Sequence, residues 1–250
     1  MVTTRFANLL IDTADKLAEA RDADAAWEAI SAVATRLRAK SVNAGVFLTG
    51  TGSIAWMRST MNPAWLEEYA GDSLHEVDPL LKASMAGEPP RLYDVEFQQR
   101  LGPPGSRYRQ LHGSMMGYGY RYMITHSWTQ GTENKCLVLG CEDDPTHLFG
   151  PGTDRAFSAV AAMLSCRMEP PGAGTPDGRA FGTSWQLLDP REAEILSRLA
   201  QGMTEDDIAE RVGLSEADVL RVIASASGKM RAGSRDETLA LAVLRGLLTL

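Results

Sequence analysis

The stretch from residue 187 to residue 250 constrains the fold most, because it predicts several short helices in close succession. Residues that cap helix starts, an Asp, Thr or Ser followed three positions later by Glu or Asp, occur at Asp189, Thr204 and Ser215. Such side chains accept hydrogen bonds from the first backbone N–H groups of a helix, and Pro190 suits the position after the first cap. Gly202 ends the first predicted helix, and Gly213 allows a tight bend before the third. Three short helices with this turn predict a helix-turn-helix.

Residues 184–250 resemble the C-terminal DNA-binding domain of the LuxR family of quorum-sensing transcription factors. The matching motifs, in the family's order, are Leu188-Asp189-Pro190-Arg191-Glu192, Leu199-Ala200-Gln201-Gly202, Ile208-Ala209-Glu210-Arg211, Gly213-Leu214-Ser215, Val219, Lys229 and Leu241-Ala242 to Gly246-Leu247-Leu248. The resemblance implies a four-helix domain whose third helix lies in the major groove, with flanking Lys and Arg side chains on phosphates. The residues that it assigns to DNA contact are Ser215, Arg221, Ser225, Lys229, Arg211 and Arg231.

The third helix departs from the family pattern on the face that would read DNA. Where the family usually has Thr-Val-Lys-x-His and a following Asn, this chain has Asp218-Val219-Leu220-Arg221-Val222 and Ser225. Residues 181–250 hold eight Lys and Arg against eleven Asp and Glu, a net charge of −3. Cationic contact with phosphate dominates DNA affinity. We therefore expect DNA binding through a weakened reading helix, unless the local placement of the arginines outweighs the net charge.

The composition is that of a globular protein with room for one large and one small domain, at 250 residues and 44% hydrophobic. The net charge of −7 argues against a generally basic nucleic-acid binder, so any DNA affinity must come from a local patch. The three Cys lack metal-ligand spacing, and the N-terminus lacks a basic and apolar signal segment. No apolar run approaches the roughly 20 residues of a membrane span. We expect a reduced, cytoplasmic protein without a membrane segment.

Hydrophobic periodicity predicts the elements of the N-terminal part. Helices are expected at residues 6–18, 25–37, 63–70, 80–85, 106–116 and 153–168, and strands at 41–49, 54–59, 91–97, 120–128 and 135–142, the last two as a hairpin. This order predicts an α+β domain over residues 1–168, an antiparallel sheet flanked by helices in an α-β-α sandwich. A Pro- and Gly-rich linker at 169–183 then leads to the all-α four-helix domain of residues 184–250.

Trp65, Tyr69 and Asp78 form the second motif of the chain. A Trp and a Tyr four residues apart on a helix are more often core residues than ligand contacts. Asp78 changes this interpretation, because a carboxylate flanked by Val77 and Pro79 is expected to be partly buried, and a buried charge needs hydrogen-bond donors. A ligand amide N–H would be such a donor, while the indole N–H of Trp65 could donate to a ligand carbonyl.

The same Trp-x3-Tyr-x8-Asp-Pro spacing occurs in the acyl-homoserine-lactone-binding domain of the LuxR family, which residues 1–168 resemble. The resemblance implies that Trp65 donates to the lactone carbonyl, Asp78 accepts from the ligand amide and Tyr69 lines the acyl channel. Met61 stands where a Tyr is common in the family, and Met123 stands where a Gly is expected. The predicted ligand-binding residues are Trp65, Tyr69, Asp78, Pro79, Tyr93, Met61 and Met123. The ligand could be a differently shaped acyl lactone, another small apolar molecule, or none.

Catalysis has little support in the sequence. The four His are dispersed without a zinc pattern, and His126 near Cys136 is better explained as a strand residue beside a small buried hydrophobe. We expect no catalytic residue, no metal and no cofactor, apart from a small-molecule signal such as an acyl-homoserine lactone.

These patterns predict a LuxR-type quorum-sensing transcriptional regulator that binds an acyl-homoserine lactone or related small apolar signal and acts through a dimeric helix-turn-helix. Three alternatives remain: an anti-activator that forms heterodimers with a related regulator, an orphan that needs no ligand, and a sensor without a DNA role whose C-terminal domain serves only dimerisation. A homodimer is expected, because two half-sites supply affinity that one short helix-turn-helix lacks. The predicted dimer helices are residues 153–168 and 236–248, with contacts in the first from Ala156, Val160, Met163 and Leu164.

Overall fold

The computed structural model describes residues 2–171 and 185–248, without the side chains of residues 2–5 and 151. The chain divides into two compact units, residues 1–182 and 183–250. Most of the predicted linker at 169–183 lies outside the described residues. Among the helices that are described, none combines the length and hydrophobicity that a membrane span requires.

A five-stranded antiparallel sheet forms the centre of the N-terminal unit, with the strand order β2-β1-β5-β4-β3. The strands are β1 (Ser41–Leu48), β2 (Ile54–Ser59), β3 (Leu92–Asp94), β4 (Tyr122–Gln130) and β5 (Glu133–Cys141). The predicted hairpin of β4 and β5 is confirmed, and its tight turn includes Gly131, which adopts a positive φ of 60°. Because β5 is the central strand, it is buried along most of its length.

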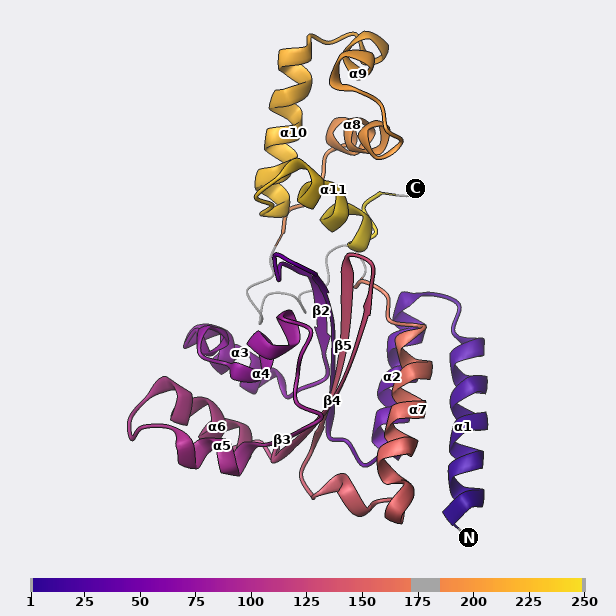
Figure 1. Ribbon diagram of the computed structural model, residues 1–250, viewed down its shortest axis with the longest axis vertical. Coiled ribbons are helices and arrows are strands. Elements are labelled where there is room, and N and C mark those ends of the chain that lie inside the picture. The colour runs from indigo at the N-terminus through magenta and orange to yellow at the C-terminus, as the bar shows by residue number, and fades with distance from the viewer. Residues whose placement is uncertain (1, 172–184, 249–250) are drawn as a thin grey trace. The chain divides into compact units, whose positions relative to one another are not determined.

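Helices cover both faces of this sheet (Figure 1). On one face lie α1 (Val2–Glu19), α2 (Ala23–Arg36) and α7 (Thr153–Ser165), and on the other lie α3 (Pro63–Gly71), α4 (Pro79–Met85), α5 (Val95–Leu101) and α6 (Arg107–Gly117). Short 3-10 helices occur at Leu74–Glu76 (η1), Pro145–His147 (η2) and Gly150–Gly152 (η3). The predicted α-β-α sandwich is therefore confirmed, with hydrophobic side chains buried on both faces of the sheet.

Helix α5 was not predicted from the sequence. A short strand was predicted within residues 91–97, and β3 (Leu92–Asp94) is that strand. Asp94 ends β3 and caps α5, because its side chain accepts a hydrogen bond from the backbone N–H of Phe97 at 2.9 Å. The Asp was a helix-start signal, and the short strand before it obscured that signal.

Helix α7 packs inside its own unit, where it contacts α1 and β5. Ala156, Val160 and Leu164 are at most 1% exposed. These three residues were predicted to be dimer contacts on the surface of the helix, and that prediction is wrong. Side chains that complete the core of one unit are not available to a second copy.

The C-terminal unit is a domain of four short helices, α8 (Pro190–Ala200), α9 (Glu205–Val212), α10 (Glu216–Met230) and α11 (Arg235–Leu244). The three predicted helix starts are confirmed, since capping boxes begin at Asp189, Thr204 and Ser215. Gly213 ends α9 in the left-handed conformation, with φ at 69°, which turns the chain into α10. The predicted all-α helix-turn-helix architecture is confirmed.

Candidate functional site

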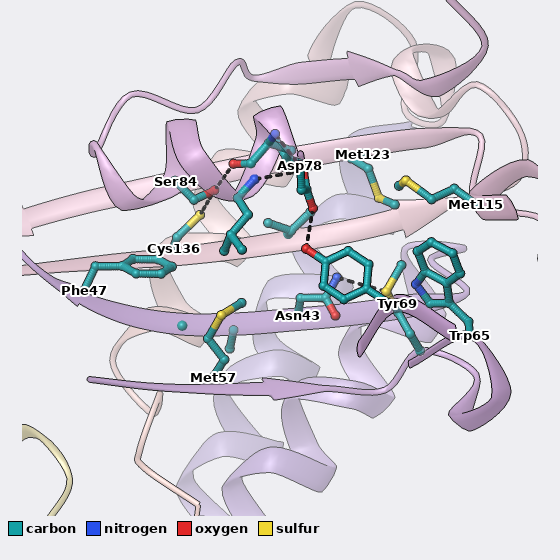
Figure 2. A pocket seen from close by; sticks show the side chains of 16 residues that line it. Asn43, Phe47, Met57, Trp65, Tyr69, Asp78, Ser84, Met115, Met123 and Cys136 are labelled. Atoms are coloured by element: carbon teal, nitrogen blue, oxygen red, sulfur yellow. Dashed lines mark hydrogen bonds between the residues drawn. The ribbon is translucent and has the colours of Figure 1, made fainter. Parts of the chain in front are cut away.

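A cavity lies between the sheet and helices α3, α4 and α6 (Figure 2). Its lining residues are Asn43, Ala44, Gly45, Phe47, Met57, Met61, Trp65, Tyr69, Asp78, Leu80, Leu81, Ser84, Met115, Met123, Cys136 and Val138. The free space is about 60 Å³, well below the roughly 300–1,000 Å³ of small-molecule pockets. A drug-sized ligand would therefore require lining side chains to move.

Five of the seven predicted ligand-binding residues line this cavity, namely Met61, Trp65, Tyr69, Asp78 and Met123. The other two lie outside the lining. Pro79 occupies the first position of α4. The hydroxyl of Tyr93 lies 2.6 Å from Nε2 of His112, whose Nδ1 lies 2.7 Å from the carbonyl oxygen of Tyr108. Nδ1 must donate to that carbonyl, so Nε2 accepts from Tyr93, and burial lowers the pKa of His112.

The chain itself supplies hydrogen-bond donors to the half-buried carboxylate of Asp78. Its Oδ1 accepts from the backbone N–H groups of Leu80 at 2.8 Å and Leu81 at 3.1 Å, which caps α4. Its Oδ2 accepts from the hydroxyl of Tyr69 at 2.8 Å. Burial raises the pKa of Asp78, and these hydrogen bonds oppose the rise. The need for donors was correctly predicted, but donors internal to the chain meet it without a ligand amide.

The indole N–H of Trp65 is the open donor of the cavity. Trp65 is 2% exposed, and its ring packs against Tyr69 and Tyr118 with centroid distances of 5.6 and 5.8 Å. Its Nε1 makes no hydrogen bond with any residue that the structure describes. This nitrogen is nevertheless not fully enclosed by those residues. Figure 2 shows the nitrogen-bearing edge of the indole on the side of the ring toward Tyr69.

The remaining polar lining groups have partners. Oδ1 of Asn43 accepts from the hydroxyl of Ser59 at 2.5 Å, and its Nδ2 lies 3.6 Å from the sulfur of Met61. The hydroxyl of Ser84 donates to the carbonyl of Leu80 at 2.8 Å and lies 3.5 Å from the thiol sulfur of Cys136. The cavity is therefore mostly apolar, and Trp65 Nε1 is the one side-chain nitrogen of its lining that has no hydrogen-bond partner among the described residues.

Several lining residues were missed by sequence reasoning because they come from elements far apart in the chain. The sheet register places Met57 and Cys136 on either side of Gly45, in one row across β2, β1 and β5. Phe47 lies two residues further along β1 and Met115 lies on α6. No local spacing marks these residues, since only strand pairing brings them together.

Two of the predicted DNA contacts, Ser215 and Arg221, are bonded to Asp218 at the start of α10. The hydroxyl of Ser215 donates to the Asp218 carboxylate at 2.6 Å and accepts from its backbone N–H at 3.2 Å. Arg221 forms an ion pair with the same carboxylate, although its side chain is 76% exposed. The hydrogen bonds from Ser215 and the charge of Arg221 lower the pKa of Asp218, so this acid is ionised at neutral pH.

Lys229 and Ser225 are bonded to Glu192, a residue of α8 that was not predicted to matter for this face. Lys229 Nζ lies 2.6 Å from the Glu192 carboxylate and 3.4 Å from that of Asp189, and the hydroxyl of Ser225 donates to Glu192 at 2.8 Å. Glu192 is 2% exposed, so these bonds fasten α8 to α10. Of the last two predicted contacts, Arg211 is exposed on α9, and Arg231 follows α10 with a positive φ of 56°.

The outer face of α10 is largely apolar and small. Its exposed residues are Glu216, Ala217, Leu220, Arg221, Ala224, Ser225 and Gly228. Leu220 is 49% exposed, whereas Val222 is half-buried beside α8. The face therefore carries one cation, Arg221, which is paired with Asp218.

Residues 186–242 match the profile of the family described as bacterial regulatory proteins, luxR family. The C-terminal unit is a LuxR-family domain. The match covers α8, α9 and α10 and most of α11. The description of this family as regulatory proteins agrees with the prediction of a LuxR-type regulator.

Solved structures of LuxR-family regulators resemble the chain. One is an N-acylhomoserine lactone dependent LuxR-family transcription factor, CepR2 from Burkholderia cenocepacia, at 20% identity over 66% of this chain and 93% of that chain, with a TM-score of 0.49. Another is SdiA from Escherichia coli, at 16% identity over 99% of both chains and a TM-score of 0.46. SdiA in complex with octanoyl-rac-glycerol aligns at 14% identity over 98% and 96%, with a TM-score of 0.44. No curated protein sequence matches the chain.

Proposed function

We propose that the protein is a ligand-responsive transcription regulator, in which a small apolar molecule held in the cavity of the N-terminal unit controls the LuxR-family domain. The observation that carries this proposal is the indole N–H of Trp65, which lines an apolar cavity and has no hydrogen-bond partner among the described residues. A ligand with a hydrogen-bond acceptor would give this donor a partner, worth about 0.5–1.5 kcal/mol net, and would also gain the burial of its apolar surface.

An acyl-homoserine lactone, the ligand predicted from the resemblance, has groups that suit this site. Its carbonyl would accept from Trp65, and its amide N–H would approach Oδ2 of Asp78, which accepts only one hydrogen bond from the described residues. Space for the ligand would come from the methionines of the lining, because unbranched thioether chains have three rotatable bonds and repack easily.

A homodimer is part of the proposal, because a short helix-turn-helix contacts few phosphates alone. The support lies on α11, which was one of the two predicted dimer helices. Leu239 and Val243 are one turn apart on that helix and half-buried in the single chain, whereas Leu241 and Ala242 are in the core. A second copy of the chain packed against Leu239 and Val243 would bury these two side chains.

A ligand-induced rise in melting temperature tests the proposal. A ligand at about 100 times its dissociation constant adds about 2.7 kcal/mol to the stability of the native state, a rise of roughly 5 to 10 °C for a unit of this size. The panel would include N-octanoyl-homoserine lactone and simple ketones. Trp65→Phe should remove most of the rise, while Trp128→Phe, outside the lining, should not. If no member of the panel shifts the unmodified protein, the proposal is wrong.

A second candidate function is a regulator that acts on a related regulator by heterodimerisation and has little DNA contact of its own. It is favoured by the bonds of Arg221, Ser225 and Lys229 to acidic residues of the same unit. DNA phosphates would have to replace these carboxylate partners. Polarisation assays against genomic fragments separate the two candidates. A nanomolar complex with a defined DNA site at physiological salt would exclude the second.

A further inference from the structure

We infer that the ligand of the N-terminal cavity is a compact, flat conjugated ring compound with one hydrogen-bond acceptor, and not a molecule with a long acyl chain. This inference rests on the proposed function and specifies its ligand class. It depends on three properties of the lining: its sulfur atoms, its aromatic walls and its single open donor.

Sulfur atoms enter the cavity from separate elements. Met57 comes from β2, Met115 from α6, Met123 from β4 and Met61 from the loop before α3. Figure 2 shows Met115 and Met123 toward the Trp65 end of the view and Met57 toward the Phe47 end. A thioether near the edge of an aromatic ring gains energy beyond simple burial, whereas beside an alkyl chain it acts like any other apolar group. Four thioethers around one space therefore favour a ring over a chain.

Aromatic side chains form further parts of the wall. Phe47 lies on β1, and Trp65 and Tyr69 lie one turn apart on α3. Rings of this kind make offset or edge-to-face contacts with another ring, again beyond the gain from buried area. An alkyl chain in the same place gains only the free energy of burying its apolar surface.

The small free space of the cavity also opposes a long chain. Gly45 would leave room above the sheet, but Met57 and Phe47 fill that room: a Cβ added to Gly45 would lie 3.1 Å from Met57 Cγ and 3.2 Å from a ring carbon of Phe47. The remaining space is about 60 Å³. A flat ring can be accommodated by turning a few thioether chains, whereas an extended chain needs a continuous channel.

The polar groups of the lining define the hydrogen bonding of the ligand. Trp65 Nε1 is an open donor, so the ligand needs one acceptor, such as a ring ketone. Asp78 is served by Tyr69, Leu80 and Leu81. The ligand therefore needs no amide donor.

Calorimetry on the full chain with three probes tests this inference. The probes are 2-acetylnaphthalene, 2-dodecanone and N-octanoyl-homoserine lactone, which have equal numbers of carbon atoms. We expect 2-acetylnaphthalene to bind the tightest. Met57→Leu, Met115→Leu and Met123→Leu should each weaken its binding by about two- to tenfold, because the swap removes sulfur and keeps volume. The matched control is Met85→Leu, because Met85 packs near the cavity without lining it.

The alkyl ketone separates a sulfur effect from a general loss of packing. The affinity for 2-dodecanone should change less than twofold in the three methionine variants. Trp65→Phe should weaken the binding of both ketones. A readout without substitutions uses protein labelled at the methionine methyl groups. The ring current of bound 2-acetylnaphthalene should shift the resonances of Met57, Met115 and Met123 but not that of Met85.

The outcomes distinguish the inference from the proposed function. If no probe binds, the proposed function fails. If 2-dodecanone or the lactone binds as tightly as the aryl ketone, or if the three variants weaken all probes equally, a small apolar ligand is retained but the ring class is wrong. Absence of ring-current shifts at the lining methionines in the presence of bound aryl ketone would also overturn the inference.

Discussion

Replacing Tyr69 by Phe should destabilise the N-terminal unit in a pH-dependent way. The substitution removes the hydroxyl that donates to Oδ2 of Asp78 at 2.8 Å. A hydrogen bond to a charged group contributes about 1.5–3 kcal/mol and one between neutral groups about 0.5–1.5 kcal/mol. With Asp78 ionised we expect a loss of about 2 kcal/mol, which lowers the melting temperature by roughly 4 to 8 °C in a unit of this size.

The sign of the pH dependence follows from the pKa of Asp78. Burial raises this pKa in the folded protein, and the bond from Tyr69 lowers it. A carboxyl group with a raised folded pKa binds its proton more tightly in the folded than in the unfolded state. The free energy of unfolding therefore falls as the pH rises from the unfolded pKa of about 3.9 through the folded pKa. Without the Tyr69 bond the folded pKa rises further, so the loss caused by Tyr69→Phe should grow with pH.

Urea unfolding followed by circular dichroism at about pH 8 and about pH 4.5 measures this difference. The matched control is Tyr118→Phe, because Tyr118 also packs on Trp65 but its hydroxyl has no partner in the described parts of the chain. The control should change stability little, and equally at both pH values. A Tyr69→Phe loss below about 0.5 kcal/mol, or one that does not depend on pH, would refute the assigned role of the Tyr69–Asp78 bond.

Three further predictions concern the C-terminal unit. Ser215→Ala should lower its stability by about 1 kcal/mol through loss of the α10 cap, measured by thermal unfolding with Ser197→Ala as a control. Glu192→Ala should cost more than Ser215→Ala, because it removes the acceptor of Lys229 and Ser225 and of a backbone N–H; equal or smaller cost would contradict the role of Glu192 in joining α8 to α10. Leu220→Lys should strengthen nonspecific DNA binding and steepen its salt dependence by about one counterion, whereas an unchanged slope in a folded variant would place Leu220 away from the DNA.

The local sequence determined the helices of the C-terminal unit. Asp189, Thr204 and Ser215 each start a helix because a capping box involves only residues three positions apart. Gly213 likewise marks the bend after α9, because glycine adopts the left-handed conformation without strain. Hydrophobic periodicity likewise predicted most strands and helices of the N-terminal unit, since the period reports which face of an element is buried. The short β3 and its neighbour α5 were the exception, because a three-residue strand leaves too little pattern to separate it from a capped helix.

The candidate site was predictable only where its residues are close in sequence. Trp65, Tyr69 and Asp78 lie on adjoining elements, and the sequence indicated both their convergence and the need of Asp78 for donors. That the hydroxyl of Tyr69 is one of these donors depends on how α3 packs against the start of α4. Met57 and Met115 join the lining only through strand register and helix packing, which no local pattern encodes.

Tertiary structure also decided which surfaces are free. The apolar stripe of α7 suggested a dimer interface, but the same stripe is what the sheet and α1 bury, and periodicity cannot tell a partner in the same chain from one in another. Arg221 and Lys229 count as cations in the sequence. In the folded unit Asp218 holds Arg221 from one turn earlier in α10, whereas Asp189 and Glu192 hold Lys229 because helix packing brings α8 beside α10. Charge composition follows from the sequence alone, whereas the pairing of each charge depends on distances that only the fold determines.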